Sequence, residues 1–158
     1  MPIQAVNNSH VICAPVTGDA LPLEKVADPV FASGMLGQGI AVRTATDVAF
    51  SPVTGTVTAV VKTKHAVAIK ADSGAEVLVH VGVDTVRLHG EGFSLFVKVG
   101  SRVQAGDPLI AFDRALIAEK NLDDTVIVTV TNAGEFSKVA PVAGDEVHAG
   151  AALIEVEG

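Results

Sequence analysis

The chain has 158 residues, of which 49% are hydrophobic and only 18% charged, and its formal net charge is −7 at pH 7. This composition excludes intrinsic disorder, and an acidic chain without a lysine or arginine cluster is a poor ligand for nucleic acid or anionic lipid. With one cysteine, no run of 18 apolar residues and no basic leader at the N-terminus, the sequence predicts a cytoplasmic protein of one domain, without disulfides or membrane insertion.

The predicted elements are mainly strands. A short helical turn is expected first, within residues 24–31. Strands are predicted where β-branched and apolar residues gather between Gly, Pro, Asp or Asn, over residues 55–61, 66–71, 76–81, 93–97 and 126–131. Asp113 is expected to cap a helix over residues 115–120. Several of these strands are apolar on both faces, which favours a sandwich or a closed barrel.

Two sequence patterns recur along the chain. Residues 100–110 and 144–154 both fit G-x-x-V-x-A-G-x-x-L-I, and P-V-x-G occurs at residues 15–18, 52–55 and 141–144. Glycine suits turns that need a positive φ, and the Leu-Ile pairs suit the start of core strands. The repeat predicts two similar half-units that pack together.

His65 and His80 are the side chains that most suggest chemistry. They lie on consecutive predicted strands, on either side of the turn sequence Asp-Ser-Gly at residues 72–74. A loop at residues 72–73 would place the two imidazoles directly opposite each other, and a loop at 73–74 would place them diagonally on the same face. Any loop of even length therefore brings the rings together, whereas a loop of odd length or a bulge does not.

Three interpretations fit two neighbouring neutral imidazoles. One accepts a phosphoryl group while the other donates a hydrogen bond to it, or both bind a metal ion, or both are ordinary strand residues. The loop after His80 places backbone amides and the Asp84 carboxylate near the ring, although Asp84 also suits a solvated turn. The chain lacks the motifs G-x-x-x-x-G-K-[ST], G-x-S-x-G, H-E-x-x-H and C-x-x-C. A phosphoryl group would therefore arrive from another protein rather than from bound ATP.

Residues 77–92, VLVHVGVDTVRLHGEG, resemble the active-site signature of the glucose-type enzyme IIA family of the bacterial phosphoenolpyruvate-dependent sugar phosphotransferase system. The likeness extends to APVTGDALPLEKVADPVFASGMLGQGIAV, SPVTGTVTAVVKTKHAVAI and VGSRVQAGDPLIAFD. The resemblance implies one all-β domain over residues 1–158, with its core over about 12–157. It also implies a flattened barrel or sandwich of the duplicated hybrid-motif type, with one or two short helices.

The resemblance further implies a phosphotransferase component that needs no cofactor. The phosphocarrier protein HPr would phosphorylate Nε2 of His80, and His80 would pass the phosphoryl group to the IIB domain of a sugar permease during sugar uptake. His65 matches a second histidine that stabilises the phosphoryl group, and Thr63 matches a threonine that orients His65.

The resemblance also predicts a docking surface. Asp28 and Asp84 match acidic residues that receive arginine from the donor protein, and Val30, Phe31 and Val86 match the surrounding apolar patch. Arg87 stands where better-known members have an acidic residue, so the regulatory partners of those members do not carry over. Glucose, N-acetylglucosamine and β-glucoside systems all use this type of domain.

Alternative families fit less well. A zinc metallopeptidase related to lysostaphin would use His80-x-x-x-Asp84, but its H-x-H motif is absent, which leaves His65 and His80 with adventitious zinc at most. A biotinyl or lipoyl carrier shares the glycine-rich repeat, yet neither Met1 nor Met35 precedes the lysine that it needs. A regulator that binds proteins according to its phosphorylation state is compatible with the carrier.

Overall fold

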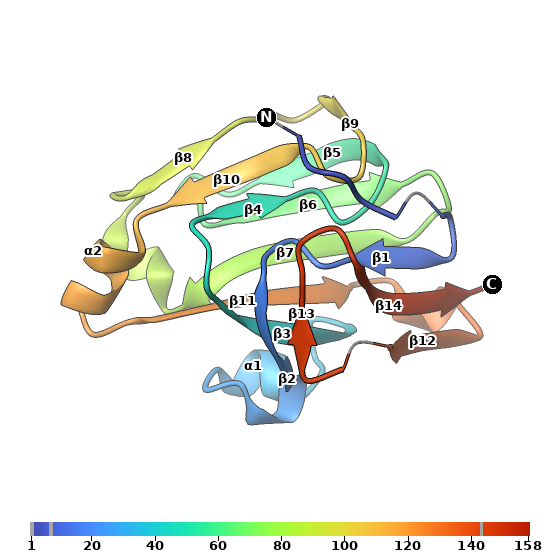
Figure 1. Cartoon of the computed structure of the whole chain (residues 1–158), viewed down its shortest axis with the longest axis horizontal. Coiled ribbons are helices and arrows are strands. Elements are labelled where there is room, and N and C mark those ends of the chain that lie inside the picture. Colours follow the sequence, from blue (N-terminus) through green and yellow to red (C-terminus); the bar gives the residue numbers. More distant parts are fainter. Residues whose placement is uncertain (1, 7, 143) are drawn as a thin grey trace.

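The computed structural model describes residues 2–6, 8–142 and 144–158, and most of them lie in or between strands of three sheets (Figure 1). The largest sheet has the order β13 (Glu146–Val147), β2 (Gly18–Pro22), β3 (Gln38–Thr44), β11 (Asp123–Val130), β7 (Glu76–Val83), β6 (Ala66–Ala71), β5 (Gly55–Val60) and β9 (Arg102–Val103). Two smaller sheets have the orders β1 (Val11–Cys13), β14 (Ala152–Glu157), β12 (Lys138–Pro141) and β4 (Val48–Phe50), β10 (Pro108–Phe112), β8 (Phe93–Leu95). The all-β prediction is confirmed, and because the sheets are not closed, the sandwich is the correct one of the two expected forms.

The central strands β7 and β11 have two differently covered faces. Val77, Val79 and Val81 of β7 pair with three valines of β11, and all six side chains belong to the main core between the sheets. Side chains alternate along a strand, so His80 and its partner Ile127 point to the other face. A smaller apolar cluster covers that outer face and consists of Leu23, Val26, Phe31, Ala41, Val83 and Ile127.

The sequence repeat corresponds to a duplicated architecture. The two copies form β9 with β10 and β13 with β14, and the short strands β9 and β13 lie at opposite ends of the large sheet. The P-V-x-G elements at residues 15–18 and 52–55 lead into β2 and β5, which pair with β13 and β9. The third P-V-x-G element includes residue 143, which lies outside the described residues. The predicted packing of two similar half-units is confirmed.

The helices are short. The expected turn within residues 24–31 is present as the 3₁₀ helix η1 (Leu23–Lys25) and helix α1 (Pro29–Ala32). Helix α2 (Arg114–Glu119) begins after Asp113, whose Oδ1 accepts a hydrogen bond from the Leu116 N–H at 3.0 Å, as predicted. Two further 3₁₀ helices are η2 (Thr85–Leu88) and η3 (Ala133–Glu135). Within the described ranges, no helix is both long and apolar enough to cross a bilayer.

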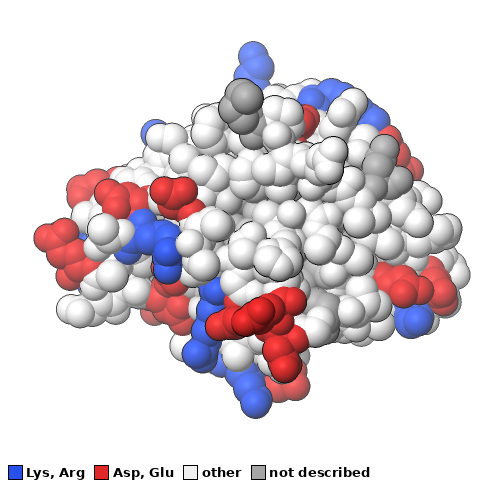
Figure 2. Space-filling view, viewed as in Figure 1, with Lys and Arg blue, Asp and Glu red and all other residues white. Residues whose placement is uncertain are grey.

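Charged side chains surround an uncharged area on the face that carries β1, β4 and β14. Figure 2 shows acidic and basic side chains interspersed around the rim of this view, and neither sign forms a continuous stripe there. This distribution agrees with the acidic net charge of −7 and gives no basic track for a nucleic acid on this face.

Candidate functional site

His65 and His80 lie side by side on the outer face of the large sheet. Their ring centroids are 4.8 Å apart, and the ring planes are nearly perpendicular at 86°. Phe31 of α1 packs against His80 with a centroid distance of 4.9 Å, and Phe93 lies 6.3 Å from His65. The predicted neighbourhood of the two imidazoles is therefore confirmed, and aromatic rings flank the pair.

The rings meet by a different route from the predicted one. In the β6–β7 hairpin, Ala66 rather than His65 lies opposite His80. The Ala71 N–H donates a hydrogen bond to the Ala75 carbonyl at 2.8 Å, and these two residues enclose a three-residue loop in which Gly74 has a φ of 96°. The expected loop of even length is therefore wrong, because the turn uses the left-handed conformation of Gly74 and adds one residue.

A backbone turn before β6 brings the His65 ring next to His80 despite the changed register. In a regular continuation of the observed register, His65 would point away from His80. The chain instead leaves the strand conformation at Lys64, which has a φ of 64°, and His65 precedes the first residue of β6. This turn carries the His65 ring to the face of His80.

His80 is a half-buried, neutral imidazole. Its Nδ1 is inaccessible to solvent and makes no hydrogen bond of ordinary geometry with the described part of the chain. Burial lowers the pKa of His80 to about 4, and the charge of His65 acts in the same direction, whereas the backbone of Gly82 and the Asp28 carboxylate oppose the shift. The ring is therefore neutral at pH 7, and with Nδ1 buried, Nε2 is the nitrogen left for chemistry.

His65 is held by a neighbouring hydroxyl. Thr63 Oγ1 lies 2.8 Å from Nδ1 of His65, and the ring itself is only 6% exposed. Burial lowers the pKa of His65, and the backbone of Thr63 partly offsets this effect. The structure thus brings Thr63 to the nitrogen where the predicted orienting hydrogen bond would form.

The segment around α1 forms one edge of the site. Asp28 precedes the helix, and its Oδ1 accepts a hydrogen bond from the Val30 N–H at 2.9 Å. Pro29 occupies the first helical position, where its missing N–H costs nothing. Phe31 points inward and is only 3% exposed, whereas Val30 points outward. The Asp28 charge acts on His80, which places this predicted residue within electrostatic reach of the ring.

The segment after β7 forms a second edge. Asp84 is exposed and adopts the left-handed conformation, with a φ of 60°, directly before η2. Val86, on the first turn of η2, is 50% exposed. Both predicted docking residues are accessible here, two and four residues after Gly82.

Sequence reasoning missed three residues that surround the two imidazoles: Ala66, Phe93 and Ile127. Ile127 pairs with His80 from β11, and Ala66 lies opposite His80 on β6. Phe93 and Gly82 also contribute, one through its ring and the other through its backbone. The backbone that follows His80 was expected near the ring from the sequence, whereas the other contacts depend on strand register.

The site does not match a metal centre. No group of three or more His, Cys, Asp or Glu side chains suited to hold a metal ion occurs among residues 2–6, 8–142 and 144–158. Two imidazoles alone leave half of a tetrahedral zinc shell without protein ligands.

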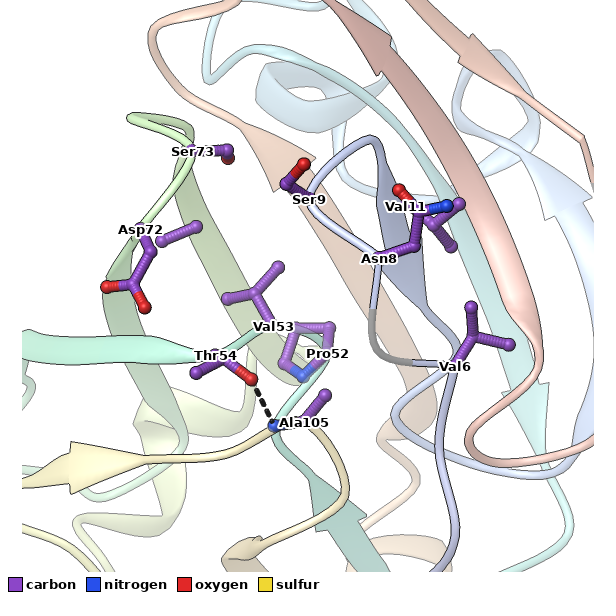
Figure 3. Close-up of a pocket in the computed structure, with 11 residues that line it drawn as sticks. Val6, Asn8, Ser9, Val11, Pro52, Val53, Thr54, Asp72, Ser73 and Ala105 are labelled. Carbon is purple, nitrogen blue, oxygen red and sulfur yellow. Dashed lines mark hydrogen bonds between the residues drawn. The ribbon is translucent and has the colours of Figure 1, made fainter.

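A cavity of about 270 Å³ lies elsewhere, between the N-terminal segment and the turn of the β6–β7 hairpin (Figure 3). Val6, Asn8 and Ser9 face Asp72 and Ser73 across it, and the Thr54 hydroxyl accepts a hydrogen bond from the Ala105 N–H at its floor. Neither histidine lines this cavity, because both lie at the other end of the hairpin.

The chain is similar to known proteins of one family. The family model for the phosphoenolpyruvate-dependent sugar phosphotransferase system, EIIA 1, matches residues 10–136. The glucose-specific EIIA component of Oceanobacillus iheyensis is 45% identical over 88% of this chain and 84% of its own length. The structure of glucose permease IIA from Mycoplasma capricolum matches with a TM-score of 0.83 and 35% identity, covering 91% of this chain and 93% of that chain.

Other relatives are longer proteins with several components. The mannose-specific EIIBCA component of Corynebacterium glutamicum is 44% identical over 93% of this chain, which spans 22% of that relative. The β-glucoside-specific EIIBCA component of Dickeya chrysanthemi is likewise 44% identical over 93% of this chain, which spans 23% of its length. The chain belongs to the EIIA 1 family of the phosphoenolpyruvate-dependent sugar phosphotransferase system, whose EIIA members are phosphotransferase components in sugar uptake.

Proposed function

We propose that this chain is a cytoplasmic phosphoryl carrier, which accepts a phosphoryl group from phospho-HPr on Nε2 of His80 and passes it to the IIB domain of a sugar permease. The observation that carries this proposal is the imidazole pair, with rings 4.8 Å apart and Nδ1 of His80 buried. A buried Nδ1 leaves one nitrogen for an incoming group, and the second ring lies close enough to contact that group.

The transfer itself needs a neutral nucleophile. The pKa of His80, at about 4, keeps the ring neutral at pH 7. With the ring proton on the buried Nδ1, the lone pair of Nε2 is available for the incoming group. Nε2 forms the new P–N bond as the P–N bond to the donor histidine breaks, in line, so the protein mainly positions groups and neutralises charge. No metal or cofactor takes part in this step.

His65 stabilises the phosphoryl group in this scheme. When the Thr63 hydroxyl donates to Nδ1 of His65, the ring proton must sit on Nε2, and that N–H becomes a donor toward a phosphoryl oxygen. A hydrogen bond to an ionised phosphoryl oxygen is stronger than one between neutral groups. With the hydroxyl as donor, the Thr63 contact gives the tautomer that the proposed role of His65 requires.

The two edges of the site suit a partner surface that is apolar with basic residues at its rim. Val30 and Val86 are 41% and 50% exposed and supply apolar contact area. Asp28 and Asp84 supply the negative charges that would meet arginine side chains of HPr. Exposed complementary charges act mainly on the rate of association and on specificity.

The proposed acceptor is a IIB domain of a glucose-family permease. Relatives named EIIBCA components combine the A component with B and C components in one chain, which supports transfer between these parts. The names of the relatives include glucose, mannose and β-glucoside, so the sugar would be selected by the permease rather than by this chain. Regulatory proteins that recognise the phosphorylation state would use the same surface.

Incubation with phosphoenolpyruvate, enzyme I and HPr, followed by intact mass measurement, tests the proposal. We expect the mass of one acid-labile phosphoryl group on the parent protein and none on His80→Gln. The matched control His148→Gln changes an exposed histidine outside the site and should be labelled like the parent. Labelling of His80→Gln at the parent rate would show that His80 is not the acceptor.

A further inference from the structure

Thr85 is a polar residue that the fold buries completely, five positions after His80. It is 0% exposed and forms the first residue of η2. Its hydroxyl donates a hydrogen bond to the Val81 carbonyl at 2.5 Å. Its methyl group fills the space beside Gly82, because a Cβ added to Gly82 would overlap Cγ2 of Thr85. One side chain therefore holds both residues that follow His80.

Val81 and Gly82 connect the backbone near His80 with that of His65. The Val81 N–H donates a hydrogen bond to the His65 carbonyl at 2.7 Å, and the backbone of Gly82 acts on the His80 ring. A displacement of Val81 and Gly82 would consequently change the position of both imidazoles.

Gly82 is also closely packed against the start of β11. Gly82 adopts a φ of 85°, and a Cβ there would lie 2.8 Å from the Asp123 carbonyl oxygen. The β7–β11 pairing is irregular at this point, where its register shifts between Asp123 and Val126. The regular ladder is thus interrupted where His80 needs a fixed backbone, and the Thr85 hydroxyl and methyl group make contacts at that interruption.

We propose that Thr85 is a positioning residue for phosphoryl transfer: it fixes the backbone of Val81 and Gly82 and thereby keeps His80 in the one ring orientation and tautomer that directs Nε2 outward. This inference rests on the proposed function of His80. The hydrogen bond of Thr85 is made to the Val81 carbonyl, so its effect on the imidazoles passes through the backbone. The hydroxyl is the essential part, because it holds the carbonyl of the residue next to His80.

Two variants separate the hydroxyl from the methyl group. Thr85→Val keeps the shape and removes the hydrogen bond to Val81, whereas Thr85→Ser keeps the hydroxyl and removes the methyl group. Thr44→Val is the matched control, because Thr44 is 5% exposed and its hydroxyl also donates to a backbone carbonyl, that of Thr46, at 2.7 Å. Thr44 lies on β3, which β11 separates from β7.

The first measurement is the ¹⁵N spectrum of the His80 imidazole at pH 7, which reports the tautomer without any transfer reaction. We expect a single tautomer protonated on Nδ1 in the parent, in Thr85→Ser and in Thr44→Val, and a mixture of tautomers in Thr85→Val. A parent-like spectrum for Thr85→Val, or a mixture for Thr85→Ser, would overturn the inference. This readout stays decisive even if the parent accepts no phosphoryl group, an outcome that would refute only the proposed function.

The second measurement is the rate of phosphoryl transfer from phospho-HPr to each variant. Misplacement of a reacting group commonly costs up to about 100-fold, so we expect Thr85→Val to react about 10- to 100-fold more slowly than the parent. Thr85→Ser should react at close to the parent rate, and Thr44→Val should lose thermal stability but not rate. An equal loss of rate in Thr85→Val and Thr44→Val would show that Thr85 acts only through stability.

Discussion

His80 and His65 lie on the same face of the sheet, His80 half-buried and His65 buried, but their ring nitrogens have different surroundings. Nδ1 of His65 has the Thr63 hydroxyl at 2.8 Å, whereas Nδ1 of His80 lies buried without a hydrogen bond of ordinary geometry in the described residues. Burial lowers the pKa of both rings below the usual value for histidine. These different surroundings suit the two tasks proposed for identical side chains, nucleophile for His80 and hydrogen-bond donor for His65.

The depressed pKa of His80 predicts a pH-dependent stability. The native ring titrates at about pH 4 and the unfolded ring near pH 6.5, so only the unfolded state binds this proton between those values. The contribution is complete above pH 6.5 and is lost as the pH falls to about 4, by about 3 kcal/mol at most. Urea unfolding should therefore show that the parent loses stability relative to His80→Gln as the pH falls from 6.5 to about 4. A difference that stays constant with pH would contradict the burial of a neutral ring.

The proposed role of His65 predicts a split between accepting and donating the phosphoryl group. His65→Ala removes the donor, whereas His65→Gln retains a neutral amide N–H. A hydrogen bond to a charged group contributes about 1.5–3 kcal/mol, so its loss in the transition state would slow onward transfer to a IIB domain about 10- to 150-fold in His65→Ala. Both variants should still accept a phosphoryl group on His80, with His65→Gln intermediate in onward transfer. Rates are measured with a chelator present, and undiminished onward transfer by His65→Ala would remove His65 from the mechanism.

At the scale of elements, the strands of the hairpin were predictable but their pairing was not. β6 matches the predicted residues 66–71, and β7 extends the predicted 76–81 by two residues. Composition marks such strands, whereas register depends on the conformations of single residues, here Gly74 and Lys64 with positive φ. The four strands before residue 55 were missed: β1 and β4 have only three residues each, and glycine, proline or polar residues interrupt the apolar pattern of β2 and β3. The prediction that the two imidazoles are neighbours is nevertheless correct, because the turn at Lys64 compensates for the changed register.

Helix α1 links the proposed docking surface to local structure, because Asp28 both caps this helix and belongs to that proposed surface. Its carboxylate caps the helix through the Val30 N–H, and its charge faces the proposed HPr interface. Asp28→Asn keeps an oxygen for the cap and removes the charge, so we expect slower transfer from phospho-HPr and a weaker dependence on ionic strength. Asp28→Ala should lose the cap as well, at about 1 kcal/mol of stability.

Rates over a range of salt concentrations test this docking prediction. Glu157→Gln is the charge-matched control, because Glu157 is an exposed carboxylate at the end of β14, in another sheet. The control should keep the salt dependence of the parent. Identical salt dependence in Asp28→Asn and the parent would exclude Asp28 from docking.

At the scale of the whole molecule, the N-terminal segment joins the two half-units. The Ile3 N–H donates to the Gly106 carbonyl and the Val6 N–H donates to the Gly150 carbonyl, both at 2.9 Å. Gly106 and Gly150 occupy the same position in the two sequence repeats. The Cys13 thiol donates to the Val6 carbonyl at 3.0 Å, and burial raises the pKa of this thiol to about 11, which keeps it a neutral donor. The repeat predicted the two turns, but not that one segment would lie against both.

Gly150 predicts a measurable coupling between this segment and the second repeat. Gly150 has a φ of 90°, and a Cβ there would overlap the Gln4 carbonyl oxygen. Gly150→Ala should therefore cost about 1–2 kcal/mol for the left-handed backbone, and about 1–3 kcal/mol more for the overlap. Deletion of residues 2–6 removes the overlapping atoms, so the same substitution should cost only the backbone part in the truncated protein. Urea unfolding of the four proteins gives the coupling energy. Equal costs of Gly150→Ala in the full-length and truncated chains would show that the segment does not pack on this turn in solution.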